Sequence, residues 1–234
     1  MKPASPTLPL NLGGGLLLRR SRAEDRQALV EFNSFVHGVP GDPPRPDVMV
    51  GAWTADLLSG SHPTFGVDDF TIVEDSSSGR IVSACNLISQ TWKYAGIPFG
   101  VGRPELVGTH PDYRNRGLVR RQFEVLHAWS EERGELAQAI TGIPYYYRLF
   151  GYKMCVPLDT GRFVYETQIK KLKEGEQELY LIRKAGEDDI PELIACYTQL
   201  ERRSPLSSQM DEIRWRYELS GKSEKNVTRV ELYM

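Results

Sequence analysis

The chain has 234 residues, a length that suits one large domain or one domain plus part of another. Hydrophobic residues make up 40% and charged residues 26%, as in ordinary globular proteins, and the net charge is only −2. With 29 Lys and Arg against 31 Asp and Glu, no overall positive field favours nucleic acid, and we expect no nucleic-acid partner.

The cysteines, the apolar runs and the first residues of the chain bear on the compartment of the protein. The three cysteines, Cys85, Cys155 and Cys196, are widely spaced and form no metal-binding pattern, so we expect free thiols and no metal. No apolar run reaches the roughly 18–20 residues of a membrane span. The Pro- and Gly-rich start lacks a signal-peptide core, and we interpret residues 1–15 as a disordered tail. The expectation is a cytoplasmic protein with no membrane partner.

The first half of the chain predicts a strand, two helices and a meander. A strand is expected over 15–20, and a helix follows Ser21 because apolar residues recur at helical spacing through Leu29 and Phe32. After a Pro-rich loop, the apolar stretch 48–58 predicts a second helix. Three β-rich runs joined by short turns then predict an antiparallel meander, with strands at 69–75, 80–92 and 103–109.

The second half begins with a predicted amphipathic helix from Leu118, which ends near Gly134. A strand is expected over 135–140, and Pro144 and Gly151 are suited to begin and end a short helix. Two closing strands are expected at 152–157 and 161–169. The polar stretch 170–179 is interpreted as a linker.

Two stretches after the linker resemble two stretches near the start, in the same order. "LRRSRAEDRQALV" from Leu18 resembles "IRKAGEDDIPELI" from Ile182, at an offset of 164 residues. "WTADLLSG" from Trp53 resembles "WRYELSG" from Trp215. These matches predict that 180–234 begins a second copy of the first fold, although two unrelated strand–helix starts would also give such matches.

The stretch "HPDYRNRGLVRRQF" from His110 concentrates positive charge at a predicted strand-to-helix turn. A helix start carries free backbone N–H groups and a positive dipole end, and a glycine lets a ligand approach the backbone closely. Arg114, Arg116 and Gly117 could therefore form a pyrophosphate cradle. From these residues alone, a solvated basic helix start is an equal alternative.

The order of the elements resembles the GNAT superfamily of N-acetyltransferases. The family's Arg/Gln-x-x-Gly-x-Gly/Ala signature is matched by Arg114 and Gly117, with Val119 where the family has Gly or Ala. Its aromatic signature is matched within "YYYRLFGY", residues 145–152. The resemblance covers 16–169, and the apparent duplication resembles tandem acetyltransferases of the enhanced-intracellular-survival type.

The resemblance implies an α/β fold with a mixed, mostly antiparallel sheet flanked by helices, and acetyl-CoA (coenzyme A) as cosubstrate. Two neighbouring strands would splay apart and receive the pantetheine arm, while the pyrophosphate would lie on the helix start. The implied cofactor-binding residues are Leu106, Val107, Gly108, Thr109, Arg114, Asn115, Arg116, Gly117, Leu118 and Val119.

The resemblance also implies direct transfer of acetyl to an amine of a small-molecule or peptide acceptor. Tyr147 occupies the family's usual general-acid position, or it packs in the core. Glu105 is one candidate base, because burial can raise a carboxyl pKa towards the useful range, and otherwise it is a strand-end charge. His110 is the other candidate, or it sets the turn before Pro111. The rival function is a non-catalytic acyl-CoA-binding or regulatory module.

The chain is expected to hold one cofactor site, in residues 16–169, and none after Lys170. The segment 228–234 resembles the strand at 69–75 and would lie in an incomplete sheet. Because an exposed strand edge recruits another strand, we expect this segment to dock on the first domain, to pair with a second subunit in a homo-oligomer, or to belong to a longer protein.

Overall fold

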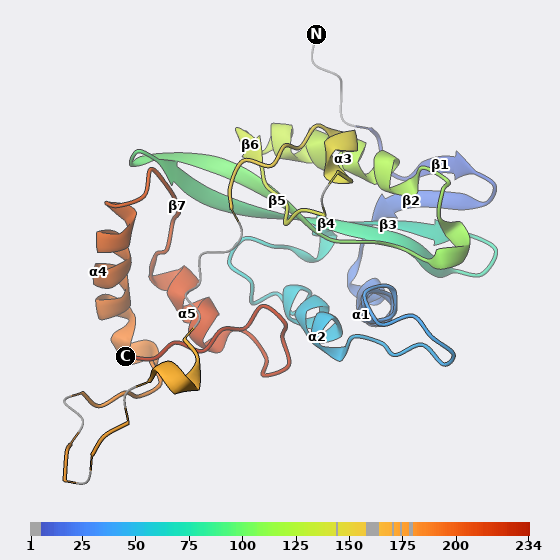
Figure 1. The fold of residues 1–234 in the computed structure, drawn as a ribbon. Helices are drawn as coiled ribbons and strands as arrows, with labels where there is room; N and C mark the ends of the chain where they lie inside the picture. Colours follow the sequence, from blue (N-terminus) through green and yellow to red (C-terminus); the bar gives the residue numbers. More distant parts are fainter. Residues whose placement is uncertain (1–5, 144, 158–163, 170, 174, 178–179) are drawn as a thin grey trace.

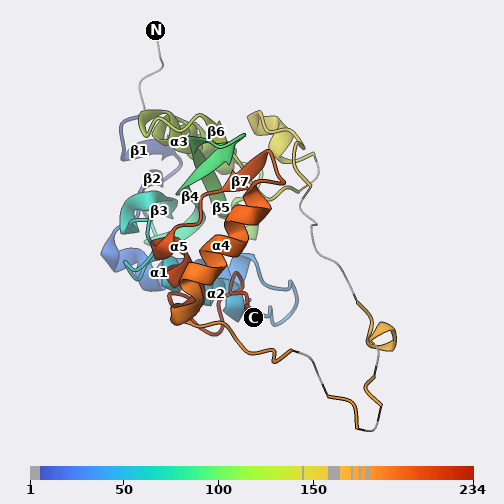
Figure 2. The ribbon, with the colours of Figure 1, turned by 90° about the vertical axis from the view of Figure 1, so that its left-hand side faces the viewer.

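The computed structural model describes residues 6–234 except 144, 158–163, 170, 174 and 178–179. A central sheet separates two layers of helices, with α3 (Leu118–Glu132) on one face and α1 (Arg26–Val36) and α2 (Val48–Leu57) on the other (Figure 1). Helices α4 (Ile190–Glu201) and α5 (Glu212–Ser220) lie beside one end of the sheet (Figure 1 and Figure 2).

The sheet is mixed and mostly antiparallel, as predicted. Its strands are β1 (Leu10–Gly13), β2 (Leu16–Arg20), β3 (Phe70–Asp75), β4 (Arg80–Tyr94), β5 (Ile97–Thr109) and β6 (Ala137–Gln138), in that spatial order. Neighbours from β1 to β5 are antiparallel, and β6 is parallel to β5. The seventh strand, β7 (Leu206–Ser208), pairs with the end of β4 that extends, together with the start of β5, beyond the other strands.

The alternating side chains of β3 and β4 supply two apolar cores, one on each face of the sheet. On one face Ile72 and Ile88 pack with Leu29 and Phe32 of α1. On the other face Val73, Val82 and Leu87 pack with four residues of α3, namely Leu118, Val125, Leu126 and Trp129. This packing fixes the start of α3 against the sheet.

The N-terminal segment differs from the prediction. Residues 10–13, expected within a disordered tail, form β1 and pair with β2. Gly13, Gly14 and Gly15 all have positive φ, which allows the tight reversal between the two strands. Leu10 and Leu12 pack against the α3-side core, so burial of these two side chains stabilises the pairing.

The predicted closing strands are also corrected. Residues 152–157 form no strand, and 164–169 contain a 3₁₀ helix at Glu166–Gln168; residues 158–163 lie outside the described residues. The side chains of Met154 and Val156 are exposed, so neither of them holds this segment against the sheet. β6 is shorter than the predicted strand 135–140, and β5 begins six residues before the predicted start at 103. The short helix expected before Gly151 is a 3₁₀ helix at Tyr147–Phe150, and Pro144 lies outside the described residues.

The two similar sequence stretches make the same local contacts. In the first, the Arg19 guanidinium binds both carboxylate oxygens of Asp25 and the carbonyl of Arg20. In the second, Arg183 binds both oxygens of Asp189 and the carbonyl of Lys184 in the same way. Each pair is followed by two helices, α1 and α2 or α4 and α5. These contacts support the predicted duplication.

Residues between β7 and Asn226 pack on the first domain, whereas 228–234, for which such docking was one of three expected outcomes, pairs instead with Arg183 and Ala185 of its own segment. Strand β7 extends the sheet at β4, and Asp56 Oδ2 of α2 accepts hydrogen bonds from Ser223 and from Asn226 Nδ2 at 2.7–2.9 Å. Asn226 is buried in this contact, and Tyr217 of α5 packs edge-on against His62 at 4.7 Å between ring centroids.

Candidate functional site

Strand β5 presents an open backbone edge along its second half. β6 pairs with β5 only at Val101 and Gly102, and one further hydrogen bond joins Ala139 N to Gly102 O. From 103 to 109 no described strand lies on that side of β5. The two strands therefore separate where the predicted splay for a pantetheine arm was placed.

A β-bulge lies in the middle of this open edge. Across β4, Cys85 faces both Leu106 and Val107, because the register shifts between the pairs Asn86–Glu105 and Ala84–Gly108. Leu106 has φ 52°, a conformation uncommon for a branched side chain. The bulge redirects the backbone groups of the predicted segment 106–109, and no sequence signal indicated it.

The turn before α3 carries backbone groups that have no partner in the described part of the chain. Asn115 and Gly117 have φ values of 61° and 72°, and α3 begins at Leu118 with no side chain capping its first turn. A side-chain carbon placed on Gly117 would meet no atom within 4 Å, so the space in front of the turn is open. The first N–H groups of α3 thus point into free space with the positive end of the helix dipole.

The arginines of this turn divide into two groups. Arg116 Nη2 donates to Asp112 O at 3.1 Å and its guanidinium lies over the Tyr113 ring, which holds its charge beside the turn. Arg114 has no ion pair among the described residues, so its charge is available to a ligand. Arg120 and Arg121 bind Leu149 O and Glu124 respectively, further along the helix.

A buried polar network joins the helix start to the strand edge. Gln122 of α3 is fully buried and donates to Thr71 O at 3.1 Å, while its Oε1 lies 2.7 Å from Ser83 Oγ. Ser83 Oγ is in turn 2.9 Å from Gly108 O and from Thr109 Oγ1. The network fixes the turn relative to the open edge of β5. Gln122 could not be recognised from the sequence, because there it is only one polar residue in a predicted helix.

Tyr147 lies at the start of the 3₁₀ helix that follows the splayed strands. Its ring is buried in an aromatic cluster around Phe123 of α3, with ring centroids 6.0 Å apart. Burial, together with the negative charges of neighbours that include Glu105, raises the pKa of Tyr147 to about 12. With this pKa the hydroxyl is protonated at neutral pH. It has no hydrogen-bond partner in the described part of the chain, so it is free to donate.

Glu105 lies on β5 directly before the bulge. Its side chain is 12% exposed and forms an ion pair with Arg103, two residues earlier on the same strand. Burial raises the pKa of Glu105, while the charge of Arg103 opposes the shift. Because Glu105 also acts on the pKa of Tyr147, the structure brings these two predicted residues into one electrostatic environment.

His110, the other predicted base, has contacts that shape the turn. Its Nδ1 accepts a hydrogen bond from Asp112 N at 3.3 Å, which caps the short helix Pro111–Tyr113. Its ring stacks on Phe35 of α1 with centroids 5.3 Å apart. These contacts fit the alternative expected for His110, in which it sets the turn before Pro111.

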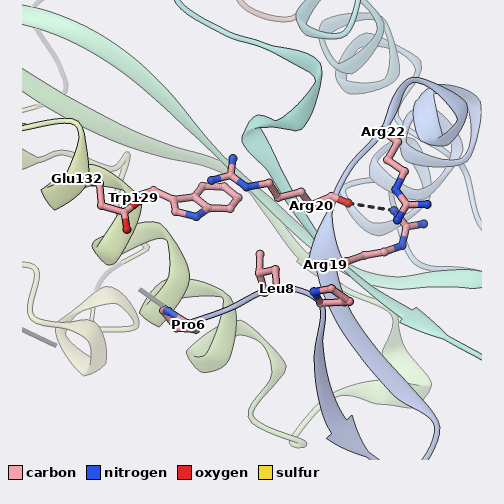
Figure 3. A pocket seen from close by; sticks show the side chains of 8 residues that line it. Pro6, Leu8, Arg19, Arg20, Arg22, Trp129 and Glu132 are labelled. Carbon is pink, nitrogen blue, oxygen red and sulfur yellow. Dashed lines mark hydrogen bonds between the residues drawn. The ribbon is translucent and has the colours of Figure 1, made fainter. Parts of the chain in front are cut away.

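A separate cavity of about 290 Å³ lies at the other end of α3 (Figure 3). There Arg20 lies over the Trp129 ring, 3.7 Å from its centroid, beside the N-terminal residues Pro6 and Leu8. Trp129 is eleven residues from Leu118, so the cavity is about 16 Å along the helix from the open turn. It is not part of the site built from Gly117 and β5.

Comparison with known proteins gives a family and a fold. Residues 19–155 match the sequence model of the acetyltransferase (GNAT) domain. No curated protein sequence is significantly similar to this chain. In the described part of the chain no helix has the length and apolarity to cross a membrane, and no group of three or more His, Cys, Asp or Glu side chains is arranged to hold a metal ion.

Among solved structures, the fold resembles Saccharomyces cerevisiae N-myristoyltransferase with bound myristoyl-CoA, at 13% identity and a TM-score of 0.66. That likeness covers 96% of this chain and 55% of the yeast chain, so this chain spans about half the length of that enzyme. A Brucella melitensis GNAT family acetyltransferase in complex with acetyl-CoA aligns over 59% of this chain and 83% of its own, at 16% identity and a TM-score of 0.47.

Proposed function

Because the chain belongs to the GNAT acetyltransferase family, we propose that it is an N-acetyltransferase that moves an acetyl group from acetyl-CoA to an amine of a small-molecule or peptide acceptor. The observation that carries the proposal is the open edge of β5 beside the uncapped turn at Gly117. One surface thus offers free strand backbone for an amide-containing arm and free helix-start N–H groups for a pyrophosphate.

The residues present fit the cosubstrate. N–H groups from Arg116 to Val119 would bind the pyrophosphate, with Arg114 adding a charge-assisted bond. The backbone of 106–109 would bind the pantetheine amides. Acetyl-CoA supplies the acetyl group as a reactive thioester.

Glu105 and Tyr147 divide the proton transfers of a direct mechanism. Glu105 accepts one proton from the acceptor's ammonium group, so that the neutral amine can attack the thioester carbonyl. The nitrogen–carbon bond forms as the carbon–sulfur bond breaks, and Tyr147 donates its proton to the departing sulfur. The nitrogen then gives up its second proton as the amide forms, and this proton restores the Tyr147 hydroxyl. The raised pKa of Glu105 makes its carboxylate a better base, and the free hydroxyl of Tyr147 suits it to donate.

A second candidate function is a non-catalytic acyl-CoA-binding or regulatory module. The observation that favours it is the ion pair between Arg103 and Glu105, which stabilises the carboxylate and weakens it as a base. Both functions require cofactor binding at the same turn. Only the enzyme consumes acetyl-CoA.

The first test is binding, measured by thermal unfolding with acetyl-CoA. At a hundredfold excess over the dissociation constant, a ligand stabilises the fold by about 2.7 kcal/mol. Gly117→Val should lose most of this shift, because a branched side chain would fill the open space before the turn. Gly134→Val is the matched control, since Gly134 also has positive φ and open surroundings but lies past the other end of α3.

The second test is turnover of acetyl-CoA over a panel of small amines and peptides, followed by thiol release. Acetylation of any amine supports the enzyme, whereas binding without turnover supports the module. If millimolar acetyl-CoA leaves the melting temperature unchanged, both functions are wrong.

We also propose that residues 180–234 begin a second GNAT-like repeat and that the organisation is that of the tandem acetyltransferases named above. The matching contacts of Arg19 and Arg183 support this proposal.

A further inference from the structure

Asn86 of β4 is a fully buried amide without a partner. Its side chain is 0% exposed, and neither Oδ1 nor Nδ2 has a hydrogen-bond partner among the residues that the structure describes. An unpaired buried polar group costs about 1–3 kcal/mol, and an amide carries both an acceptor and donors. Such groups in folded proteins normally bind something, so Asn86 requires an explanation.

The strand register places Asn86 beside the proposed base. Asn86 and Glu105 are directly opposite on neighbouring antiparallel strands, at the last pair before the bulge. Opposite residues of such a pair share one face of the sheet, with their Cβ atoms roughly 4.5–5.5 Å apart. The Glu105 carboxylate, for its part, has only Arg103 as a hydrogen-bonding partner among the described residues.

A packing role does not account for an amide at this position. The residues two before and two after Asn86 on the same strand face, Ala84 and Ile88, are apolar and belong to the α1-side core. Phe70, opposite Asn86 on β3, belongs to the same core. A leucine would fill this position without leaving polar atoms unpaired.

We propose that Asn86 is a positioning residue for Glu105, and that its amide and the Glu105 carboxylate together hold one buried water. Asn86 would accept from and donate to this water, and the water would donate to one carboxylate oxygen. The other oxygen would then face the acceptor amine. A buried water needs two to four polar partners, and this pair of side chains supplies them.

This role of Asn86 rests on the proposed function, which assigns Glu105 as the base. The acceptor's ammonium group loses one proton to Glu105, which becomes a neutral carboxylic acid. After the product leaves, Glu105 returns this proton to solvent. The charged and titratable groups that act on Glu105 are Arg103 on β5 and Tyr147 on the 3₁₀ helix, and Asn86 adds no charge.

The test measures the titration of Glu105 directly, without any acceptor. Protein containing glutamate labelled with ¹³C at the carboxyl carbon is titrated by NMR, and Glu105→Gln assigns the signal. Asn86→Leu should raise the pKa of Glu105 by about one unit, because the bound water no longer donates to its charged form. Asn86→Ser, which keeps a donor and an acceptor, should remain within a few tenths of a unit of the unaltered protein and also covers the case in which Asn86→Leu does not fold.

Asn33→Leu is the matched control, because Asn33 is also a fully buried amide in the α1 layer but bonds to Thr54 of α2. Its Glu105 signal should titrate as in the unaltered protein. An unchanged titration in Asn86→Leu, or an equal shift in Asn33→Leu, overturns the proposal. If Asn86→Leu does not fold, a shift of about one unit in Asn86→Ser overturns it.

Activity separates this proposal from the proposed function. If an acceptor is acetylated, Asn86→Leu should lower kcat and move the acidic limb of its pH profile upward, with little change in KM for acetyl-CoA. If the NMR pattern holds and no amine on the panel is acetylated, the contact with Glu105 stands and the enzyme assignment fails.

Discussion

At the residue scale, the hydroxyl of Tyr147 is the sharpest point to test. It is a protonated group in an aromatic cluster, without a hydrogen-bond partner in the part of the chain that is described. Tyr147→Phe removes the hydroxyl and keeps the ring against Phe123, so the fold and acetyl-CoA binding should change little. Turnover should fall by about 10²–10⁴-fold, the usual loss for a general acid.

The control for this prediction is Tyr152→Phe. Tyr152 packs on the same Phe123 ring but its hydroxyl already binds Gln138, so its loss should affect stability more than turnover. Equal activity of Tyr147→Phe and the unaltered enzyme would assign the proton to another group.

At the residue scale, some features of the candidate site could be predicted from the sequence and others could not. The arginine–glycine turn could be predicted, because a glycine in a basic strand-to-helix turn has a direct chemical meaning. The unpaired amide of Asn86 could not be predicted, since its significance depends on its pairing with Glu105 on the next strand and on buried surroundings that offer it no polar partner among the described residues. The polar role of Gln122 depends in the same way on Thr71 and Ser83, from two other strands.

At the element scale, α3 and β5 form one unit because Gln122 joins them. Gln122→Leu leaves Ser83 and Thr71 without this partner and should destabilise the fold by about 1–3 kcal/mol. It should also weaken acetyl-CoA binding, because the turn at Gly117 would no longer be held against the open edge of β5. Isothermal titration calorimetry and denaturant unfolding measure the two effects.

Leu126→Ala is the control for Gln122→Leu, since Leu126 is a buried residue of the same helix without a polar link to β5. Large-to-small core changes cost about 2–5 kcal/mol, so this variant should be destabilised at least as much. It should bind acetyl-CoA nearly as well as the unaltered chain. Equal loss of affinity in both variants would mean that general loosening of α3 explains the effect.

Elements with strong local periodicity were predicted well, and elements that depend on distant partners were not. The apolar stripe of α3 and the meander β3–β4–β5 carry their own signal. β1 forms because residues 10–13 pair with the edge of β2. In the sequence, Gly13–Gly15 indicated only a turn. The segment 152–157 has alternating apolar residues but pairs with no described strand, so its propensity is not realised.

At the scale of the whole molecule, the duplication proposed above extends only to the elements that precede the cofactor turn. Its Arg183–Asp189 pair, α4 and α5 correspond to Arg19–Asp25, α1 and α2. A short ribbon then pairs Arg183 with Met234, as β2 pairs with β3. The structural unit that would bind coenzyme A has no counterpart among the described residues of 180–234.

We therefore predict one acetyl-CoA per chain, measured by isothermal titration calorimetry. Residues 183–186 do repeat the Arg-x-x-Gly spacing, yet their chemistry opposes a phosphate. Gly186 has an extended backbone at φ −121°, its N–H already donates to Asp189 Oδ2, and Arg183 is held by the same carboxylate. Three acidic residues follow, Glu187, Asp188 and Asp189, and their charges would repel a pyrophosphate.

The variant Gly186→Val should therefore leave the stoichiometry and the affinity unchanged, whereas Gly117→Val should remove the single site. A titration with two equivalents bound, or a loss of binding in Gly186→Val, would mean that the second part of the chain takes part in cofactor binding. One equivalent that persists in Gly117→Val would place the site elsewhere. The positive-φ glycine before α3, with free N–H groups behind it and no carboxylate across it, is the feature that separates the two glycines.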